Sequence, residues 1–134
     1  GYIINELVKS GKVAAPIVIG RDHIDGGSMA IPSGETKNML DESDAIADWP
    51  LLNFSLNAVS GASWVSFSQG GGSGTGKSLH AEVVIVADGT NEKGRRLELV
   101  LANDSELGIA RYADAGDKTA KKVASGNKIN LPKR

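Results

Sequence analysis

The segment that decides the fold is "ASWVSFSQGGGSGTGKSLHAEVVIVAD", residues 62–88. Its two ends, "ASWVSFS" and "AEVVIVAD", are short runs rich in β-branched and aromatic residues, which is typical of strands. Between them, residues 70–76 contain five glycines. Because glycine carries no side chain and adopts positive φ angles, such a run lets the backbone approach a ligand closely. We therefore expect a ligand-binding turn between two strands, the alternative being a flexible hairpin tip.

The turn also contains a nucleotide-binding pattern. Residues 71–78, GGSGTGKS, satisfy G-x-x-x-x-G-K-[ST], the phosphate loop of nucleoside triphosphatases. That loop needs a helix directly after it, so that its amides and the helix N-terminus face the phosphates. Only residues 79–82 precede the strand-like "VVIVAD", whose Asp88 would have to serve as the Mg²⁺ ligand. A helix needs about ten residues, so these four are too few to supply it. A small nucleotide- or phosphate-binding module is therefore kept only as the alternative to a glycine-rich ligand-binding turn.

Bulk composition narrows the classes of function. The chain has 134 residues, which suits one domain with a buried core, residues 1–134. A net charge of −1 argues against nucleic acid and anionic membranes as partners. The absence of cysteine excludes a disulfide framework and a thiolate zinc site. No apolar run is long enough to span a membrane and no signal peptide is recognisable, so we expect a cytoplasmic protein.

The rest of the chain alternates helical and strand-like patterns. Apolar spacing predicts helices, and a β-branched run predicts one more strand. The expected helices are residues 3–9, a segment from Asp48 as cap to Gly61, residues 92–104 and residues 117–125, and the strand is residues 15–20. This alternation predicts an α/β fold, a Rossmann-like layered domain with a short, mainly parallel sheet and helices packed on it. Trp49 and Trp64 are expected in the core.

A polar loop of residues 21–35 follows the first strand and carries chemically versatile side chains. Arg21, Asp22 and His23 come directly after the strand, where ligands bind in α/β sheets. The arginine could hold a carboxylate, and the Asp-His pair could transfer protons. A loop hydrogen-bonded to itself explains the same residues equally well. Metal binding is disfavoured, because nothing in the sequence fixes a third or fourth ligand.

Several blocks together resemble one known family. "APIVIGRDH", "ETKNMLD.SDAIADWPLLN", "SGASWVS", "GGG.G.G.S.HA", "VIVADGT" and "R.ADAG" are similar to the C-terminal part of urocanate hydratase (urocanase). The resemblance implies a cytoplasmic lyase of histidine degradation that adds water to urocanate to give imidazolonepropionate. It also implies a homodimer and a tightly bound NAD⁺ that acts as an electrophile. Most of the NAD⁺ pocket and a catalytic cysteine are expected in upstream domains of the parent enzyme.

Carried over residue by residue, the resemblance assigns roles to the two loops. The family's GGG run corresponds to Gly70, Gly71 and Gly72, which implies contact with NAD⁺, chiefly through Gly71. The R-D-H triplet corresponds to Arg21, Asp22 and His23, which implies that they border the substrate pocket and serve catalysis.

The chain departs from the family at polar positions. Ser68 and Gln69 stand where the family typically has His-His or His-Asn, and Gly34 replaces an arginine. Lys77 replaces a tyrosine and Tyr112 a histidine. Because these changes remove proton-transfer and anion-pairing groups, and because most of the NAD⁺ pocket is expected in upstream domains, we expect the isolated chain to be inactive. A further alternative is a non-catalytic interaction fragment that folds against a partner domain.

Overall fold

The computed structural model describes residues 1–21, 39–69 and 79–131, and within these ranges the chain is an α/β protein. Its elements, in chain order, are α1 (Tyr2–Lys9), β1 (Ile17–Arg21), the 3₁₀ turn η1 (Ser43–Ala45), α2 (Asp48–Val59), β2 (Trp64–Gln69), β3 (Leu79–Ala87), α3 (Asn91–Asp114) and α4 (Lys118–Gly126). The predicted α/β class is confirmed. The expected strands on either side of the glycine-rich segment are also present, as β2 and β3.

The described strands form a sheet in the order β1-β3-β2, and both outer strands run antiparallel to β3. The prediction of a mainly parallel sheet was therefore wrong. A parallel pair needs a crossover of a dozen or more residues, whereas only residues 70–78 join β2 to β3. The antiparallel direction follows from this short connection, and the Rossmann-like arrangement is not observed in the described sheet.

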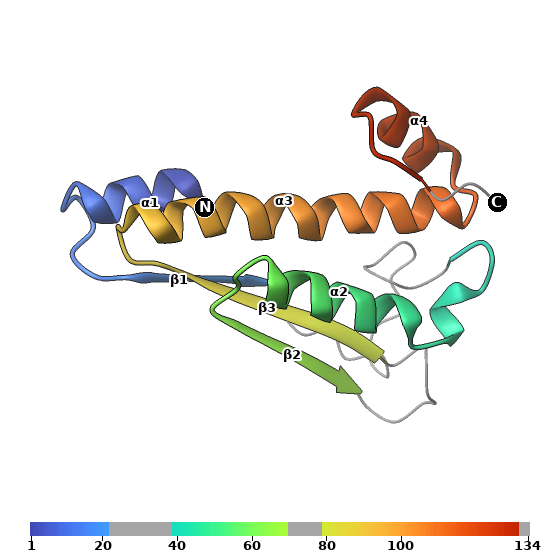
Figure 1. Cartoon of the computed structure of the whole chain (residues 1–134), viewed down its shortest axis with the longest axis horizontal. Coiled ribbons are helices and arrows are strands. Elements are labelled where there is room, and N and C mark those ends of the chain that lie inside the picture. The colour runs from blue at the N-terminus through green and yellow to red at the C-terminus, as the bar shows by residue number, and fades with distance from the viewer. Residues whose placement is uncertain (22–38, 70–78, 132–134) are drawn as a thin grey trace.

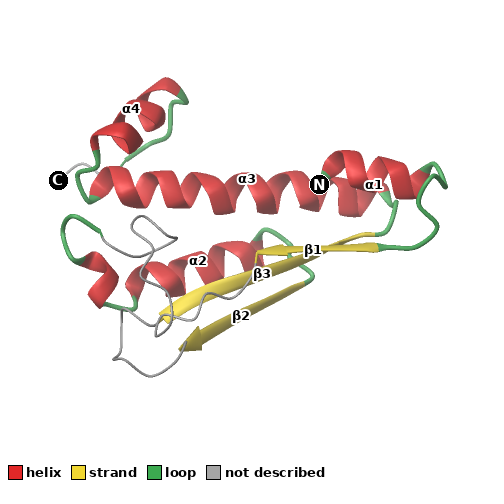
Figure 2. Ribbon diagram, turned by 180° about the vertical axis from the view of Figure 1, so that it is seen from behind, coloured by secondary structure: helices red, strands yellow, loops and turns green. Residues whose placement is uncertain are grey.

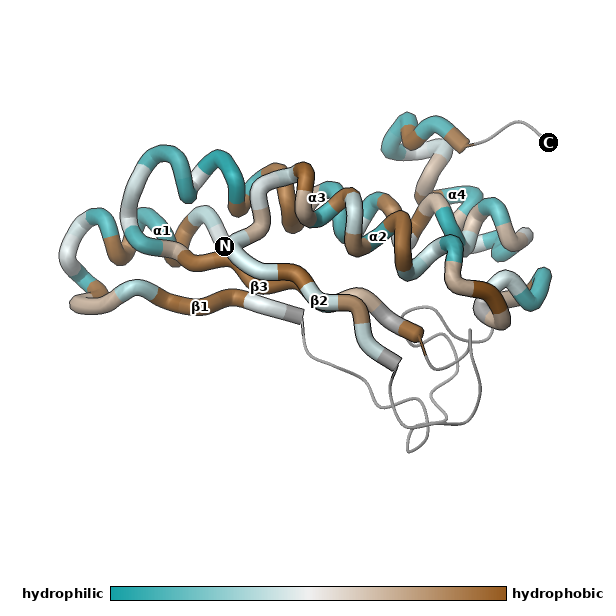
Figure 3. Tube along the Cα trace, turned by 60° about the horizontal axis from the view of Figure 1, so that its bottom comes forward, coloured by the Kyte–Doolittle hydropathy of each residue, from teal (hydrophilic) through white to brown (hydrophobic). Residues whose placement is uncertain are grey.

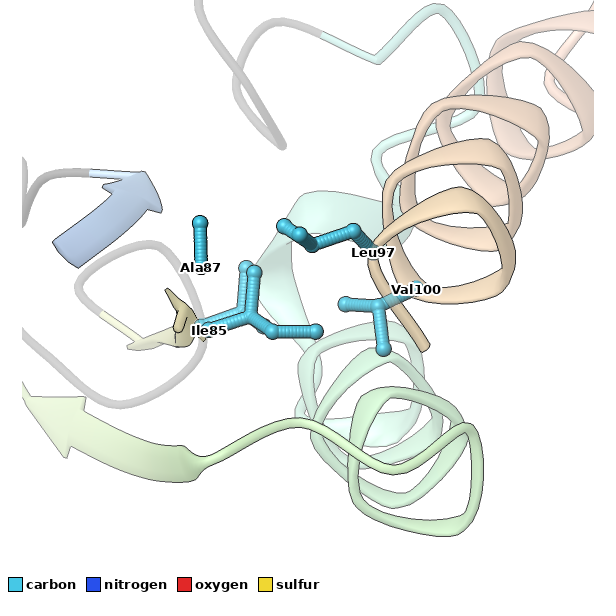
Figure 4. Close-up of a cluster of buried hydrophobic side chains, with 5 residues drawn as sticks. Ile85, Ala87, Leu97 and Val100 are labelled. Atoms are coloured by element: carbon cyan, nitrogen blue, oxygen red, sulfur yellow. The ribbon is translucent and has the colours of Figure 1, made fainter. Parts of the chain in front are cut away.

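All described helices that contact the sheet lie on one of its faces (Figures 1 and 2). α1, α2 and α3 pack on the strands, and α4 packs on α3. The core joins β3 to α3, with side chains that are at most 1% exposed (Figure 4). Its members are Val83, Ile85, Ala87, Leu97 and Val100. Burial of this kind contributes about 1.5–3 kcal/mol for each large apolar side chain.

The opposite face of the sheet is not covered by any described helix, although part of it is apolar. Residues pointing to it include Val18 and Trp64, which are 67% and 53% exposed. The prediction that Trp64 belongs to the core was therefore wrong. The tube coloured by hydropathy shows hydrophobic residues along β1 and β3 (Figure 3). An antiparallel sheet with one solvated face normally alternates apolar and polar residues, so this composition is unusual for a face in contact with water.

A buried asparagine fastens α1 to the turn between β3 and α3. The Asn5 side chain is 0% exposed; its amide donates to the Thr90 carbonyl and its Oδ1 accepts from the Gly89 N–H, both at 2.9 Å. Gly89 has a φ of +85°, and a Cβ there would lie 2.9 Å from the backbone of Lys9. Both its conformation and its close approach to α1 require glycine at this position.

Two helix boundaries differ from the sequence prediction. α3 continues ten residues beyond Asp104, the expected end, to Asp114. Thr90 caps its start by accepting from the Lys93 N–H. In α2, Asp48 is the first helical residue rather than the cap, which is Ala47. In the part of the chain that the structure describes, no helix has both the length and the apolar character needed to cross a membrane.

Candidate functional site

The two loops singled out by sequence leave the sheet at the same end. β1 and β2 are both antiparallel to β3 and therefore run in the same direction. Arg21, the last residue of β1, pairs with Val83, and Gln69, the last of β2, pairs with Leu79. The two strand ends are thus offset by four residues along β3, or about 13 Å.

This placement covers the backbone of Arg21 and the backbone that precedes the other predicted site residues. Asp22, His23, Gly70, Gly71 and Gly72 lie outside the described residues, as does the side chain of Arg21. The roles predicted for them stay predictions. Gly34 and Lys77, two of the departures from the family pattern, also lie outside the described ranges.

The surroundings of residues 71–78 do not suit a triphosphate loop. β3 begins at Leu79, directly after Ser78, so a strand occupies the place where the helix should start. Asp88, the required Mg²⁺ ligand, follows the far end of β3, about 30 Å along the strand from Leu79. Its Oδ1 instead accepts hydrogen bonds from the N–H and hydroxyl of Thr90. These two bonds are the main reason that the pKa of Asp88 is lowered.

A carboxylate that sequence reasoning missed lies on the open face of β2 and β3. Glu82 accepts hydrogen bonds from Ser66 at 2.7 Å and from Ser68 at 3.4 Å. Ser68 is one of the positions where the family typically has histidine. A lone glutamate inside the apolar run "AEVVIVA" was the available signal, since charged residues are depleted in strand interiors. These three side chains give the sheet end near Gln69 a polar, acidic character.

A cavity of about 630 Å³ lies between the first turns of α2, the second half of α3 and α4. Its volume is in the range typical of small-molecule sites. In Figures 1 and 2 these helix segments are at the end of the molecule where β2 ends and β3 begins. Its lining includes Trp49, Asn53, Asp104, Gly108, Arg111 and Tyr112. Two blocks of the resemblance, "SDAIADWPLLN" and "R.ADAG", therefore meet here although about 60 residues separate them.

The polar groups of this cavity are held in place by neighbouring side chains. The amides of Asn53 and Asn57, one helical turn apart on α2, both donate to Oδ1 of Asp104 at 2.9 Å. Arg111 is 3% exposed, and its guanidinium carbon lies 5.8 Å from the centre of the Trp49 ring. Trp49 is half-buried and lines the cavity, so its predicted place in the core was only partly right.

Sequence reasoning did not find this cavity. The helix was expected to end at Asp104, which separated that residue from Gly108 and Arg111. The available signal was the spacing of these three residues, which places them on one face of a continuous helix. Among the described residues, no group of three or more His, Cys, Asp or Glu side chains is arranged to hold a metal ion.

One comparison with known proteins identifies the relationship. The family model described as the urocanase C-terminal domain matches residues 1–126, which is nearly the whole chain. The match agrees with the blocks that the sequence shares with this family, two of which line the cavity. The chain belongs to the urocanase C-terminal domain family.

Proposed function

We propose that this chain acts as the C-terminal domain of a urocanate hydratase-like enzyme, which adds water to urocanate to give imidazolonepropionate. The observation that carries the proposal is the family match over residues 1–126. It supports a lyase of histidine degradation. A cytoplasmic location and a homodimer, both implied by the resemblance, are part of the same proposal.

In this proposal the last residue of β1, Arg21, and the two residues directly after it act on the substrate. The guanidinium of Arg21 pairs with the urocanate carboxylate, since its planar fork matches a carboxylate bidentately. Asp22 and His23 hold and move a proton, because imidazole is the side chain that titrates nearest neutrality. Support comes from the sheet, in which the ends of β1 and β2 face the same way.

The residues after β2 serve the cofactor. Gly70, Gly71 and Gly72 let the backbone approach NAD⁺ closely, and NAD⁺ when bound supplies an electrophilic ring. The pairing of β2 with β3 supports the fit of these residues to NAD⁺, because Gln69 pairs with Leu79 across the two neighbouring strands. A glycine-rich segment joining adjacent strands leaves backbone amides free of side-chain cover. The upstream domains of the parent enzyme complete the pocket.

The isolated chain is expected not to hydrate urocanate. Ser68 and Gln69 replace residues able to transfer protons, and the Ser68 hydroxyl is directed to Glu82. The test follows urocanate absorbance with this chain and NAD⁺, beside an active urocanate hydratase as positive control. A steady loss of absorbance with the chain alone would overturn the expected inactivity.

The family function is tested separately in a chimera. Residues 1–126 replace the corresponding domain of an active urocanate hydratase, and NAD⁺ is measured after denaturing the purified protein. We expect the chimera to retain NAD⁺ and to hydrate urocanate more slowly than the parent, with partial recovery after Ser68→His. A chimera that folds cooperatively but neither retains NAD⁺ nor turns over urocanate would contradict the proposal.

A non-catalytic interaction role is the second candidate, and the open face of the sheet favours it. Val18 and Trp64 expose apolar surface there, and large exposed apolar patches mark interaction sites. If the chain needs a partner domain to fold, its thermal unfolding alone will be broad and poorly cooperative. A sharp, reversible transition would count against this candidate.

A further inference from the structure

The turn between β3 and α3 contains an aspartate followed directly by a glycine, Asp88–Gly89. Such a pair is prone to a spontaneous backbone rearrangement, because glycine has no side chain to keep its backbone nitrogen away from the carboxyl carbon of the aspartate. The Asp88 side chain is only partly buried, so solvent water reaches it. The pair therefore has both the chemical groups and the access to water that the rearrangement needs.

In the folded chain both reacting groups are held by other partners. The nitrogen that would have to attack belongs to Gly89, and its N–H donates to Oδ1 of Asn5 at 2.9 Å. Oδ1 of Asp88 accepts from the N–H and the hydroxyl of Thr90, at 2.9 and 2.7 Å. These two bonds also lower the pKa of Asp88, which keeps the carboxylate ionised and therefore unreactive towards a nucleophile. The nitrogen and the carboxyl group are thus directed away from each other.

The contact that holds the nitrogen comes from α1, which lies beside the start of α3 (Figure 1). The Asn5 side chain is fully buried, and its amide also donates to the Thr90 carbonyl. α1 has eight residues, and an isolated helix of this length is not stable in water. Its place therefore depends on packing, and local opening of α1 frees the Gly89 nitrogen.

We propose that Asp88–Gly89 is a site of spontaneous isoaspartate formation and that α1 blocks this modification through Asn5. When α1 opens, the Gly89 nitrogen attacks Cγ of the protonated Asp88 carboxyl group. The N–Cγ bond forms and the Cγ–OH bond breaks, so the amide hydrogen and the hydroxyl leave as water and a succinimide ring remains. Water then cleaves the bond from the ring nitrogen to one of the two ring carbonyls, which gives aspartate or isoaspartate. One water leaves and one returns, so no other reactant is needed.

The isoaspartate form does not fit the native turn. Its main chain runs through Cβ, which adds one methylene group between Cα of residue 88 and the Gly89 nitrogen. Gly89 already lies so close to α1 that a Cβ there would be 2.9 Å from the backbone of Lys9. The shifted Gly89 N–H therefore loses its bond to Asn5, and the modified chain should hold α1 less firmly. Neither urocanate nor NAD⁺ takes part, so the inference does not rest on the proposed function.

The rate of modification is measured in the full chain, kept at neutral pH and physiological temperature. Samples are digested, and the peptide that contains residue 88 is analysed by liquid chromatography and electron-transfer mass spectrometry, which distinguish isoaspartate from aspartate. A synthetic peptide of residues 84–94 gives the rate without the fold. We expect the folded chain to convert more slowly than the peptide by roughly tenfold or more. Equal rates in the two would overturn the proposal.

Two variants separate the role of Asn5 from that of overall stability. Asn5→Ala frees the Gly89 N–H, so it should convert roughly tenfold faster than the unaltered chain. Val100→Ala is the control, because it removes buried core surface and leaves Asn5 in place. The two variants are compared at urea concentrations that give them the same free energy of unfolding. If they then convert at the same rate, the whole fold protects the site and the role proposed for α1 is wrong.

Hydrogen exchange tests the protection without any variant, and so remains available if Asn5→Ala does not fold. Exchange of the Gly89 amide, followed by NMR in the ¹⁵N-labelled unaltered chain, gives the fraction of time for which this N–H is open. The conversion rate of the folded chain should equal the rate of the peptide multiplied by that fraction. A Gly89 amide that exchanges as freely as in the peptide, or a conversion rate that departs severalfold from this product, would contradict the proposal.

Discussion

The first half of α3 packs apolar side chains against the sheet, whereas the second half places polar and charged side chains beside α2 and a cavity. In the first half Leu97 and Val100 are fully buried against β3. In the second half the corresponding contacts are those of Asp104 with two asparagines and of Arg111 with Trp49. One helix thus carries two kinds of surface. We infer that the first half supplies most of the stability, whereas the second half mainly lines the cavity.

The largest expected effect comes from the apolar half. Leu97→Ala removes a side chain that is 0% exposed and leaves a cavity beside Ile85 and Val100, so it should cost about 3 kcal/mol of unfolding free energy. The measurement is urea unfolding at constant m-value. Leu99→Ala, two residues away and 51% exposed, is the control and should stay within about 0.5 kcal/mol. Equal losses in the two variants would contradict the assignment of the core to this half.

The next effect tests how this half is fastened to α1. Asn5→Ala removes a fully buried side chain and its hydrogen bonds to Gly89 and Thr90, and it leaves two partly buried backbone groups unpaired, which should cost about 2 kcal/mol. Asn91→Ala serves as control, since its bond to Lys9 lies at the exposed surface. If the unfolding temperature falls by the same amount in both variants, the hydrogen bonds of the buried Asn5 side chain stabilise the fold no more than the exposed bond of Asn91.

A smaller effect is expected in the polar half. Arg111→Lys keeps the positive charge but loses the planar guanidinium over the Trp49 ring, and a cation–π contact of this kind is worth about 1 kcal/mol. Arg95→Lys on the exposed surface of α3 should change stability very little. The unfolding free energies of the two variants give the comparison. If Arg111→Lys costs as much as Leu97→Ala, the division between a stabilising half and a cavity-lining half is wrong.

Local patterns in the sequence predicted the elements but not how they pair. The strand at 15–20 and the helices around residues 3–9 and 117–125 were predicted correctly. Their signals, apolar spacing and flanking glycines, lie within a few residues of each element. Strand direction depends on contacts between distant segments, so the antiparallel pairing of β1 with β3 was missed. The exposed position of Trp64 was missed for the same reason, since alternation in a short strand does not say which face is covered.

The residues of the two loops were named first from their positions beside predicted strands and then from the family resemblance, and their roles stay predictions. Arg21 and the residues after it could be named from the family blocks, and the common direction of β1 and β2 supports their grouping with Gly70, Gly71 and Gly72. The cavity was not predictable in this way. The sequence pattern predicted a helix that ends at Asp104, whereas the helix continues through Gly108 to Asp114, where Arg111 and Ala113 are buried. Tertiary burial thus overrides the low helix propensity of glycine.

The smallest expected effect concerns the turn that leads into the first half of α3. The pKa of Asp88 is lowered, first by the hydrogen bond from the Thr90 N–H and then by that from the Thr90 hydroxyl. A carboxyl group whose pKa is lower in the folded state stabilises the fold at pH values above its ordinary pKa of 3.8. This stabilisation is lost as the pH falls through the folded pKa. Asp88→Asn should therefore be less stable than the unaltered chain at neutral pH.

The pH dependence of this difference separates the charge from the turn geometry. The gap between the urea midpoints of the two proteins should stay constant above the unfolded pKa and close below it, because the amide keeps an acceptor oxygen for Thr90. High salt should leave most of the gap, since the attraction of Lys93 is a lesser cause than the two hydrogen bonds. If the difference between the two urea midpoints persists unchanged at acidic pH, the turn favours aspartate for its side-chain geometry and not for its charge. The start of α3 would then owe nothing to the ionisation of Asp88, and its stability would come from the Thr90 cap and from packing.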